Sequence, residues 1–175
     1  MDKDWMFLLQ RQKQFDSIIE TNQTTKPFGL TISEQEAKLI LEEKNHTLQE
    51  QGRIEFGTGI IPKIIYVFCD SDFVDAENYV DTIIRLQEIF YMYKNEMEDE
   101  ISDDELLHFM REQFDNICFG DLEYLEGTCL AIFSQAIRAG YTGYQDTEGY
   151  GTYSALDEVK RWDYELYLEA LKGLF

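Results

Sequence analysis

The stretch SEQEAKLILEEKNHTLQEQG, residues 33–52, decides the fold class of this chain. Ser33 is followed three residues later by Glu36, the spacing of a capping box, in which each side chain satisfies a backbone N–H at the start of a helix. Apolar residues then recur at helical spacing, and Gly52 offers the left-handed backbone conformation at which helices commonly end. The stretch therefore predicts a helix over residues 33–52.

The same signals recur along the rest of the chain. Ser102 and Glu105 have the capping-box spacing, only two prolines occur in 175 residues, and glycines follow several of the periodic segments. These patterns predict an all-α domain of about seven helices. The expected helices span residues 4–20, 33–52, 62–69, 75–97 (or 71–97), 102–120, 121–140 and 154–172. Asp121 is expected to cap the sixth of these helices.

Residues 62–69 are expected to form the centre of the fold. They are apolar on nearly every helical face, which is typical of a short buried helix, and Pro62 suits its first turn. The glycine-rich residues before them are too few for a helix, so we expect at most one small β element near residues 53–57. No repeat or composition break divides the chain, and we expect a single helical domain over residues 1–175.

The first expected helix carries apolar residues at helical spacing along one side. This spacing is typical of one side of a helix. The residues on this side form a stripe of Trp5, Leu8, Gln12, Phe15 and Ile19.

The composition limits the classes of partner. The chain has 15 Lys and Arg residues against 35 Asp and Glu residues, a formal net charge of −20 and a pI near 4.3. This charge repels phosphate backbones and anionic lipids, so nucleic acids and membrane surfaces are poor partners, whereas basic proteins and divalent cations remain open. The hydrophobic content of 44% is too high for a disordered chain.

Three cysteines, Cys69, Cys118 and Cys129, are widely spaced and form no Cys-x-x-Cys pair. We interpret them as reduced thiols of an intracellular protein rather than as a disulfide framework. The first residues lack the features of a signal peptide, and no apolar run approaches the roughly 20 residues of a membrane span. The expected location is therefore the cytoplasm.

Both histidines of the chain follow a glutamate by three residues, as Glu43 with His46 and Glu105 with His108. Helical carboxylate proteins hold metals with this spacing when the side chains point into the bundle. At about 100° per residue, both pairs fall on the side of their helices opposite the apolar face. The expected core-facing residues are Ala37, Leu41 and Leu48 in one helix and Leu106, Met110, Phe114 and Ile117 in the other. We therefore expect no metal site, and the four Glu and His residues remain the ligands of an alternative, a metal-dependent enzyme.

No residue pattern identifies a catalytic site or a cofactor. The cysteines lack a histidine placed to act as a base, and no Gly-x-Ser-x-Gly motif occurs. Acid–base chemistry by carboxylates stays open, but 35 acidic residues give no reason to select a pair. We expect a non-catalytic protein that acts through contact with another protein. A metal-dependent enzyme and a small-molecule-binding protein are the alternatives.

Two segments are candidates for partner contact. Residues 140–154, GYTGYQDTEGYGTYS, combine glycines with tyrosines, a mixture that recognition loops favour. The expected anchors in this loop, for a partner or for self-association, are Tyr144 and Tyr150. Residues 96–105 are strongly acidic and would steer a basic protein partner. The expected steering residues are Glu98, Asp99 and Glu100.

Two further stretches carry a resemblance to a known family. GRIEFGTGIIPKIIYVFCDSDFV, residues 52–74, and SDDELLHFMREQFDNICFGDLEYLEGTCL, residues 102–130, resemble a family of uncharacterised small bacterial proteins that is defined only as a domain of unknown function. The resemblance spans most of the chain and implies a cytosolic bacterial protein. It implies no catalytic residue, cofactor or substrate.

Overall fold

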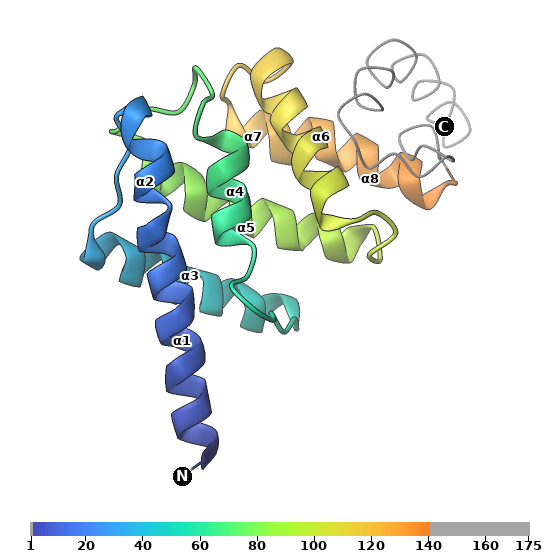
Figure 1. The fold of residues 1–175 in the computed structure, drawn as a ribbon. Coiled ribbons are helices and arrows are strands. Elements are labelled where there is room, and N and C mark those ends of the chain that lie inside the picture. Colours follow the sequence, from blue (N-terminus) through green and yellow to red (C-terminus); the bar gives the residue numbers. More distant parts are fainter. Residues whose placement is uncertain (1, 141–175) are drawn as a thin grey trace, which may run out of the picture. The chain divides into compact units, whose positions relative to one another are not determined.

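The computed structural model of the protein is all-α, as the sequence predicts (Figure 1). It describes the backbone of residues 2–140 and the side chains of residues 5–140. Six helices in this part of the chain have eight residues or more: α1 (Asp2–Glu20), α3 (Glu34–Gln51), α4 (Ile61–Phe68), α5 (Tyr79–Glu96), α6 (Asp103–Asn116) and α8 (Leu130–Arg138). The shorter helical elements are α2 (Asn22–Thr25), η1 (Lys26–Phe28), α7 (Leu122–Tyr124) and the π-helical segment η2 (Leu125–Cys129).

The sequence predicts about seven helices, and the described residues contain six helices of eight residues or more, so the predicted count is not confirmed. The seventh predicted helix, over residues 154–172, lies outside the described residues. The chain divides into two compact units, Met1–Tyr91 and Met92–Phe175, with the boundary inside α5. The expectation of a single helical domain over residues 1–175 stays a prediction.

The ends of α3 confirm the capping signals that decided the fold class. The Ser33 hydroxyl accepts a hydrogen bond from the backbone N–H of Glu36 at 3.1 Å, and the Glu36 carboxylate accepts one from the Ser33 N–H at 2.9 Å. The helix ends at Gly52, which has a positive φ of 65°. At the start of α6, the Ser102 hydroxyl likewise accepts from the backbone N–H of Glu105 at 3.1 Å.

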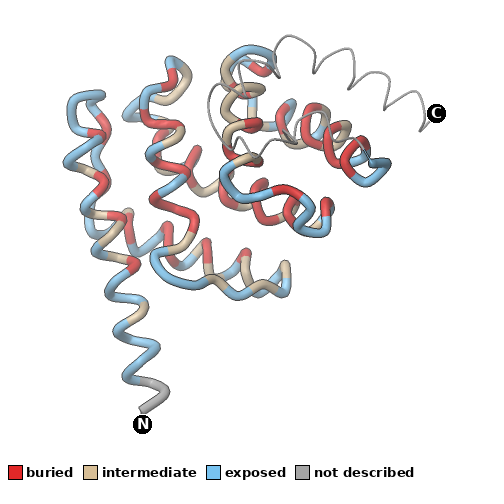
Figure 2. The backbone as a smooth tube through the Cα atoms, turned by 45° about the vertical axis from the view of Figure 1, so that its right-hand side comes forward, coloured by how far each residue is buried: buried red, intermediate tan, exposed pale blue. Residues whose placement is uncertain are grey.

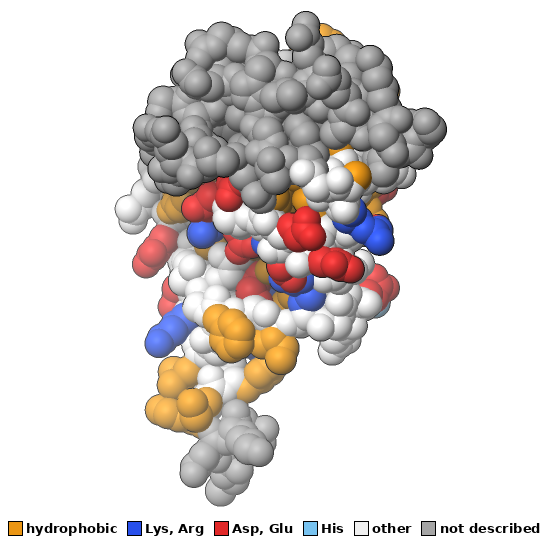
Figure 3. Space-filling view, turned by 90° about the vertical axis from the view of Figure 1, so that its right-hand side faces the viewer, with side chains coloured by type: hydrophobic (Ala, Val, Ile, Leu, Met, Phe, Trp, Pro, Cys, Tyr) orange, Lys and Arg blue, Asp and Glu red, His pale blue; other side chains and the backbone are white. Residues whose placement is uncertain are grey.

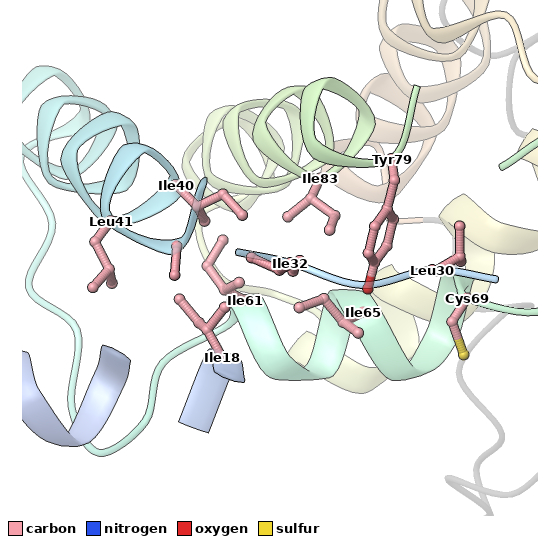
Figure 4. Close-up of a cluster of buried hydrophobic side chains, with 11 residues drawn as sticks. Ile18, Leu30, Ile32, Ile40, Leu41, Ile61, Ile65, Cys69, Tyr79 and Ile83 are labelled. Carbon is pink, nitrogen blue, oxygen red and sulfur yellow. The ribbon is translucent and has the colours of Figure 1, made fainter. Parts of the chain in front are cut away.

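The core of the first unit packs against most of α4, as predicted for a short apolar helix, but Lys63 and Tyr66 leave one side of this helix exposed (Figure 4). Ile61 and Ile65 of α4 point into a cluster to which α1, α3 and α5 also contribute. The buried members of the cluster are Ile18, Leu30, Ile32, Ala37, Ile40, Leu41, Ile61, Ile65, Cys69, Tyr79 and Ile83. Because α4 is apolar on nearly all faces, it can be covered by helices on several sides at once.

The helix predicted over residues 4–20 is confirmed as α1, but the core covers only the C-terminal part of its stripe. Trp5, Leu8 and Gln12 are exposed, and only Phe15 and Ile19 pack partly against the core. Figures 1 and 2 show the reason, since the N-terminal half of α1 extends beyond the other elements of its unit and is exposed along its length. Nothing in the described part of the unit covers the apolar stripe there.

The β element predicted near residues 53–57 is also wrong. Gly57 and Gly59 have positive φ angles of 66° and 82°, so the chain turns between α3 and α4 instead of running extended. Glu55 lies inside this turn, where its carboxylate accepts a hydrogen bond from the backbone N–H of Ile60 at 3.0 Å. The Glu55 contact and the two glycines therefore accompany a turn at the place where a short extended element was predicted.

In the second unit, one continuous helical segment runs from α7 through η2 to α8. Asp121 caps it by accepting hydrogen bonds from the N–H groups of Glu123 and Tyr124, as the sequence predicts for this residue. Phe109 of α6 stacks on Phe133 of α8, with 3.7 Å between the ring centroids.

The predicted apolar face of α6 is confirmed at three of its four residues. Leu106, Met110 and Phe114 are buried, as expected. Ile117 is half exposed because α6 ends at Asn116 and the chain has already turned away there. The face is also wider than predicted, because Leu107 and Phe109 are buried as well.

Candidate functional sites

A deeply buried charged group of the first unit is the side chain of Lys44. It is 1% exposed, and its ammonium group lies 2.7 Å from Oε1 of Glu55, whose side chain is 7% exposed. Oε1 of Gln14, on α1, accepts a second hydrogen bond from the same ammonium at 2.8 Å. The phenol of Tyr91, on α5, donates to the Glu55 carboxylate. The cluster thus joins α1, α3, α5 and the turn before α4.

The contacts of this cluster point to a structural role. Both charges are paired with each other and hydrogen-bonded to neutral groups, which is the condition for burying an ion pair without a large loss of stability. The guanidinium of Arg53 lies over the ring of Tyr91, 5.7 Å from its centroid, at the edge of the cluster.

The sequence holds a signal for Lys44. The residue lies seven positions after Ala37 and three after Leu41, so it falls on the predicted apolar face of α3. A lysine at such a position predicts a buried acidic partner, because an unpaired ammonium is too costly to bury. The partner itself, in the turn that follows α3, cannot be read from that periodicity.

A second buried lysine organises the acidic residues 96–105. The ammonium of Lys94 donates a 2.7 Å hydrogen bond to the backbone carbonyl of Ile101 and lies 2.9 Å from a carboxylate oxygen of Asp103. It also lies 3.5 Å from Asp99. The loop therefore folds around a cation, Lys94, which no pattern in the sequence identified.

The three predicted steering residues lie in this loop. Glu98, Asp99 and Glu100 are exposed, and Glu98 and Asp99 adopt positive φ angles of 53° and 57°. The backbone that carries these three residues turns around Lys94, and the carboxylate of Asp99 lies near its ammonium. The proposed partner role of these residues stays a prediction, and so does that of Tyr144 and Tyr150, which lie outside the described residues.

The two Glu-x-x-His pairs differ in their environments. His46 is exposed, as expected, and its Nε2 lies 3.0 Å from a carboxylate oxygen of Glu50. His108 was expected to be exposed but is half-buried, and this burial lowers the pKa of its imidazole, although the nearby Asp104 acts in the opposite direction. Glu43 and Glu105 are also half-buried. Among the described side chains, no group of three or more His, Cys, Asp or Glu residues is arranged to hold a metal ion.

The three cysteines are buried and form no disulfide. The sulfur atoms of Cys118 and Cys129 lie 3.6 Å apart in the second unit. Burial, with a smaller contribution from the neighbouring thiol, raises the pKa of Cys118 to about 12, and burial also raises the pKa of Cys129. Both thiols are therefore protonated at neutral pH, which makes them weak nucleophiles.

A run of consecutive exposed apolar residues lies near the start of α1, in the first unit. We define the exposed apolar run as residues 5–9, whose side chains are between 42% and 66% exposed: Trp5, Met6, Phe7, Leu8 and Leu9. Ile54 and Phe56 in the turn after α3 are more exposed still, and Gln10 ties this turn to α1 by donating a 2.6 Å hydrogen bond to the carbonyl of Gly57. Figure 3 shows hydrophobic side chains gathered toward this end of the molecule.

Sequence reasoning missed the run, although a signal for it exists. Five consecutive apolar residues point in all directions around a helix, so one core cannot cover them all. The second unit also exposes apolar residues near the end of α6, namely Ile117, Phe119 and Tyr124. None of the helices in the described part of the chain is long and apolar enough to cross a membrane.

The comparisons with known proteins place the chain in one family. A search of curated proteins finds no match, and neither does a search of solved structures. A family model, described as a family of unknown function (DUF6323), matches residues 17–143. The match begins within α1 and after the exposed apolar run. It covers most of the chain and confirms the resemblance seen in the sequence: the chain belongs to this family of unknown function, DUF6323.

Proposed function

We propose that the protein is a non-catalytic module that acts by binding another protein surface. The observation that carries the proposal is the exposed apolar run, five consecutive large side chains that are on average more than half exposed. At about 200 Å² for each side chain, the run presents roughly 500–600 Å² of apolar surface. This equals the largest apolar patch of a typical monomeric protein, and Ile54 and Phe56 add to it.

The form of the run supports contact with a protein rather than with a small molecule. Its side chains are exposed, and the part of α1 that carries them extends beyond the other elements of the unit (Figure 2), so the run forms a convex surface instead of lining a hollow. Small-molecule sites are concave, whereas an exposed apolar helix is the element that protein grooves and partner helices recognise.

The buried charges support the non-catalytic part of the proposal. Lys44 pairs with Glu55, and Lys94 pairs with Asp103. Each ammonium also donates a hydrogen bond to a neutral oxygen of the fold. These groups, the ones most like a reactive centre in their chemistry, are therefore engaged in holding helices and loops together.

Photocrosslinking tests the proposal. A photoactivatable phenylalanine analogue replaces Trp5 in one full-length variant and Lys38, an exposed residue of α3 in the same unit, in a matched control. After irradiation in the cells that make the protein, the variant at position 5 is expected to give adducts of defined mass, identified by mass spectrometry, whereas the variant at position 38 gives none. Adducts to any protein, including a second copy of this chain, support the proposal. If position 5 gives no adduct beyond that of the control, the proposal is wrong.

A further inference from the structure

We propose that the exposed apolar run binds a second copy of the same chain, through an antiparallel and two-fold symmetric pairing of α1 with α1. The inference rests on the proposed function and names the partner of that surface. The centre of the pair lies between Phe7 and Leu8.

One face of α1 suits such a pair. Trp5, Leu8, Leu9 and Gln12 follow the spacing i, i+3, i+4 and i+7, which places them on a single side of the helix. The three apolar residues of this face are exposed. The buried Ile18 lies on another side of α1, and the residues of the stripe that do pack against the core, Phe15 and Ile19, lie beyond positions 2–13, which the proposed pair uses. A second helix can therefore lie against the exposed face without displacing the core contacts of α1.

The formal charges around the run determine the direction of the pair. Acidic residues precede the run at Asp2 and Asp4, and basic residues follow it at Arg11 and Lys13. The basic position 3, between the two acidic ones, falls on the side of the helix opposite the proposed face. Positions 2 and 13 are equally far from the centre between Phe7 and Leu8, and so are positions 4 and 11. In an antiparallel pair, each acidic position therefore lies level with a basic position of the other copy. A parallel pair in register would instead set like charges side by side.

The flanks of the helix agree with this arrangement. Positions 2 and 13 form the first couple and are separated by about three helical turns. Positions 4 and 11 form the second couple and are separated by about two turns. Because each separation is close to a whole number of turns, the two members of a couple lie on the same flank of the helix. The first couple borders one edge of the Trp5–Leu8–Leu9 face, and the second couple borders the other edge. A two-fold axis perpendicular to both helices keeps each flank on its own side. All four acidic positions of the dimer thus lie beside basic positions.

The size of the surface predicts a weak dimer. Each copy contributes about three turns of a single helix, which amounts to less than the roughly 1,200 Å² buried in total by stable interfaces. The net charge of −20 on each copy also opposes association. At about 150 mM salt the Debye length of about 8 Å screens this long-range repulsion, whereas contacting charges are screened less. The dimer is therefore expected at physiological salt and high protein concentration.

A charge-swap experiment tests the pairing. One full-length variant carries Asp2→Lys and Asp4→Lys, and the other carries Arg11→Glu and Lys13→Glu. Each variant alone sets like charges level with each other, so its self-association in sedimentation velocity is expected to be at least about tenfold weaker than that of the wild type. An equimolar mixture restores opposite charges at every couple, and native mass spectrometry is expected to detect a mixed dimer of wild-type strength.

A matched pair of substitutions tests the face. Leu8→Ser removes a residue of the proposed interface, whereas Met6→Ser removes one that is equally exposed but lies off this face. Loss of the dimer in Leu8→Ser alone supports the proposal. A wild-type monomer, a mixture that does not restore association, or equal effects of the two serine variants would each overturn it. Photocrosslinks from position 5 to a different protein, with the wild type monomeric, would overturn the dimer and leave the proposed function intact.

Discussion

Two buried lysines show how single residues hold parts of this fold. The Lys44 ammonium contacts Gln14 of α1 and the Glu55 carboxylate in the turn after α3. The Lys94 ammonium contacts the backbone carbonyl of Ile101 and the carboxylates of Asp99 and Asp103. An ammonium group loses much of its hydration when it is buried, so each site is stable only while its oxygen partners remain. Substitution of either lysine should therefore lower the free energy of unfolding by more than substitution of an exposed residue on the same helix.

We predict that Lys44→Met destabilises the protein by about 3 kcal/mol, because the Glu55 carboxylate is then buried without its cation. The exposed Lys38 of α3 gives the control, since Lys38→Met should change stability by less than about 0.5 kcal/mol. Adding Glu55→Gln to Lys44→Met removes the unpaired charge and should recover about 1 kcal/mol or more. Urea unfolding of the four proteins measures these differences. Equal effects of the two methionine substitutions would show that the buried pair contributes nothing.

Two glycines in the turn after α3 separate backbone strain from a steric clash. Gly57 and Gly59 both have positive φ, but a Cβ atom on Gly57 meets open space, whereas one on Gly59 clashes with the Glu55 carboxylate. We predict that Gly57→Ala costs about 1 kcal/mol from backbone conformation alone. Gly59→Ala should cost at least about 2 kcal/mol more, because the carboxylate must move away from Lys44. Thermal unfolding would refute the assignment if the two variants melted together.

At the level of elements, the sequence predicts the starts and ends of helices, because these depend on residues a few positions apart. The capping box at Ser33, the glycine end at Gly52 and the cap at Asp121 involve residues a few positions apart, and the structure confirms all three. The all-round apolar character of α4 likewise predicts its burial, because no orientation of such a helix leaves only polar residues in solvent.

The features that the sequence does not predict depend on distant residues. Glu55 is paired with Lys44 and Tyr91, and neither partner can be inferred from the residues that surround Glu55. The apolar stripe of α1 has the spacing of a helix face, but periodicity does not say whether the same unit or another molecule covers it. The candidate sites also differ in whether nearby or distant residues form them. The Glu-x-x-His pairs were recognised from spacing, whereas the two lysine clusters required the fold.

The acidic loop between α5 and α6 gives a prediction about an element. Backbone hydrogen bonds close the loop, including Asp99 N–H to the carbonyl of Lys94 at 2.9 Å, while the Lys94 ammonium holds its far side at Ile101. We predict that Lys94→Met speeds amide exchange of Asp99 and Glu100 at least about tenfold, because a charged hydrogen bond contributes about 1.5–3 kcal/mol.

Asp99→Asn provides the control for this measurement. Asp99 lies 3.5 Å from the ammonium and is half exposed, so its charge should contribute little. Hydrogen–deuterium exchange with mass spectrometry compares the variants on one peptide of the loop. An unchanged exchange rate in Lys94→Met, or an equal increase in both variants, would mean that Lys94 does not hold the loop.

At the scale of the whole molecule, charge and apolar surface act in opposite directions. A net charge of −20 keeps copies of the chain apart, whereas the exposed apolar run on α1 favours contact. A protein with both features associates where the local surface is complementary enough to overcome the general repulsion. The basic residues that follow the run, Arg11 and Lys13, provide that local complementarity for an acidic partner surface.

The same net charge predicts how the folded state responds to salt. Repulsion among the excess carboxylates is stronger in the compact state than in the unfolded chain, so screening should stabilise the fold. Salt also weakens exposed ion pairs such as Arg138 with Glu96, at 3.8 Å, but each of these contributes at most about 1 kcal/mol. Twenty unbalanced charges outweigh a few such pairs, so repulsion should set the sign of the response.

We therefore predict that raising sodium chloride from about 10 to 200 mM, which shortens the Debye length from about 30 Å to below 10 Å, increases the melting temperature. The expected increase is about 2–5 °C, which corresponds to roughly 1 kcal/mol for a chain of this size. Differential scanning calorimetry at low protein concentration makes the measurement without a contribution from self-association. Near the pI of about 4.3 the net charge vanishes, and the stabilisation by salt should vanish with it. A melting temperature that ignores salt at pH 7, or rises equally at both pH values, would show that the carboxylates are compensated locally and that self-repulsion does not limit the stability of the fold.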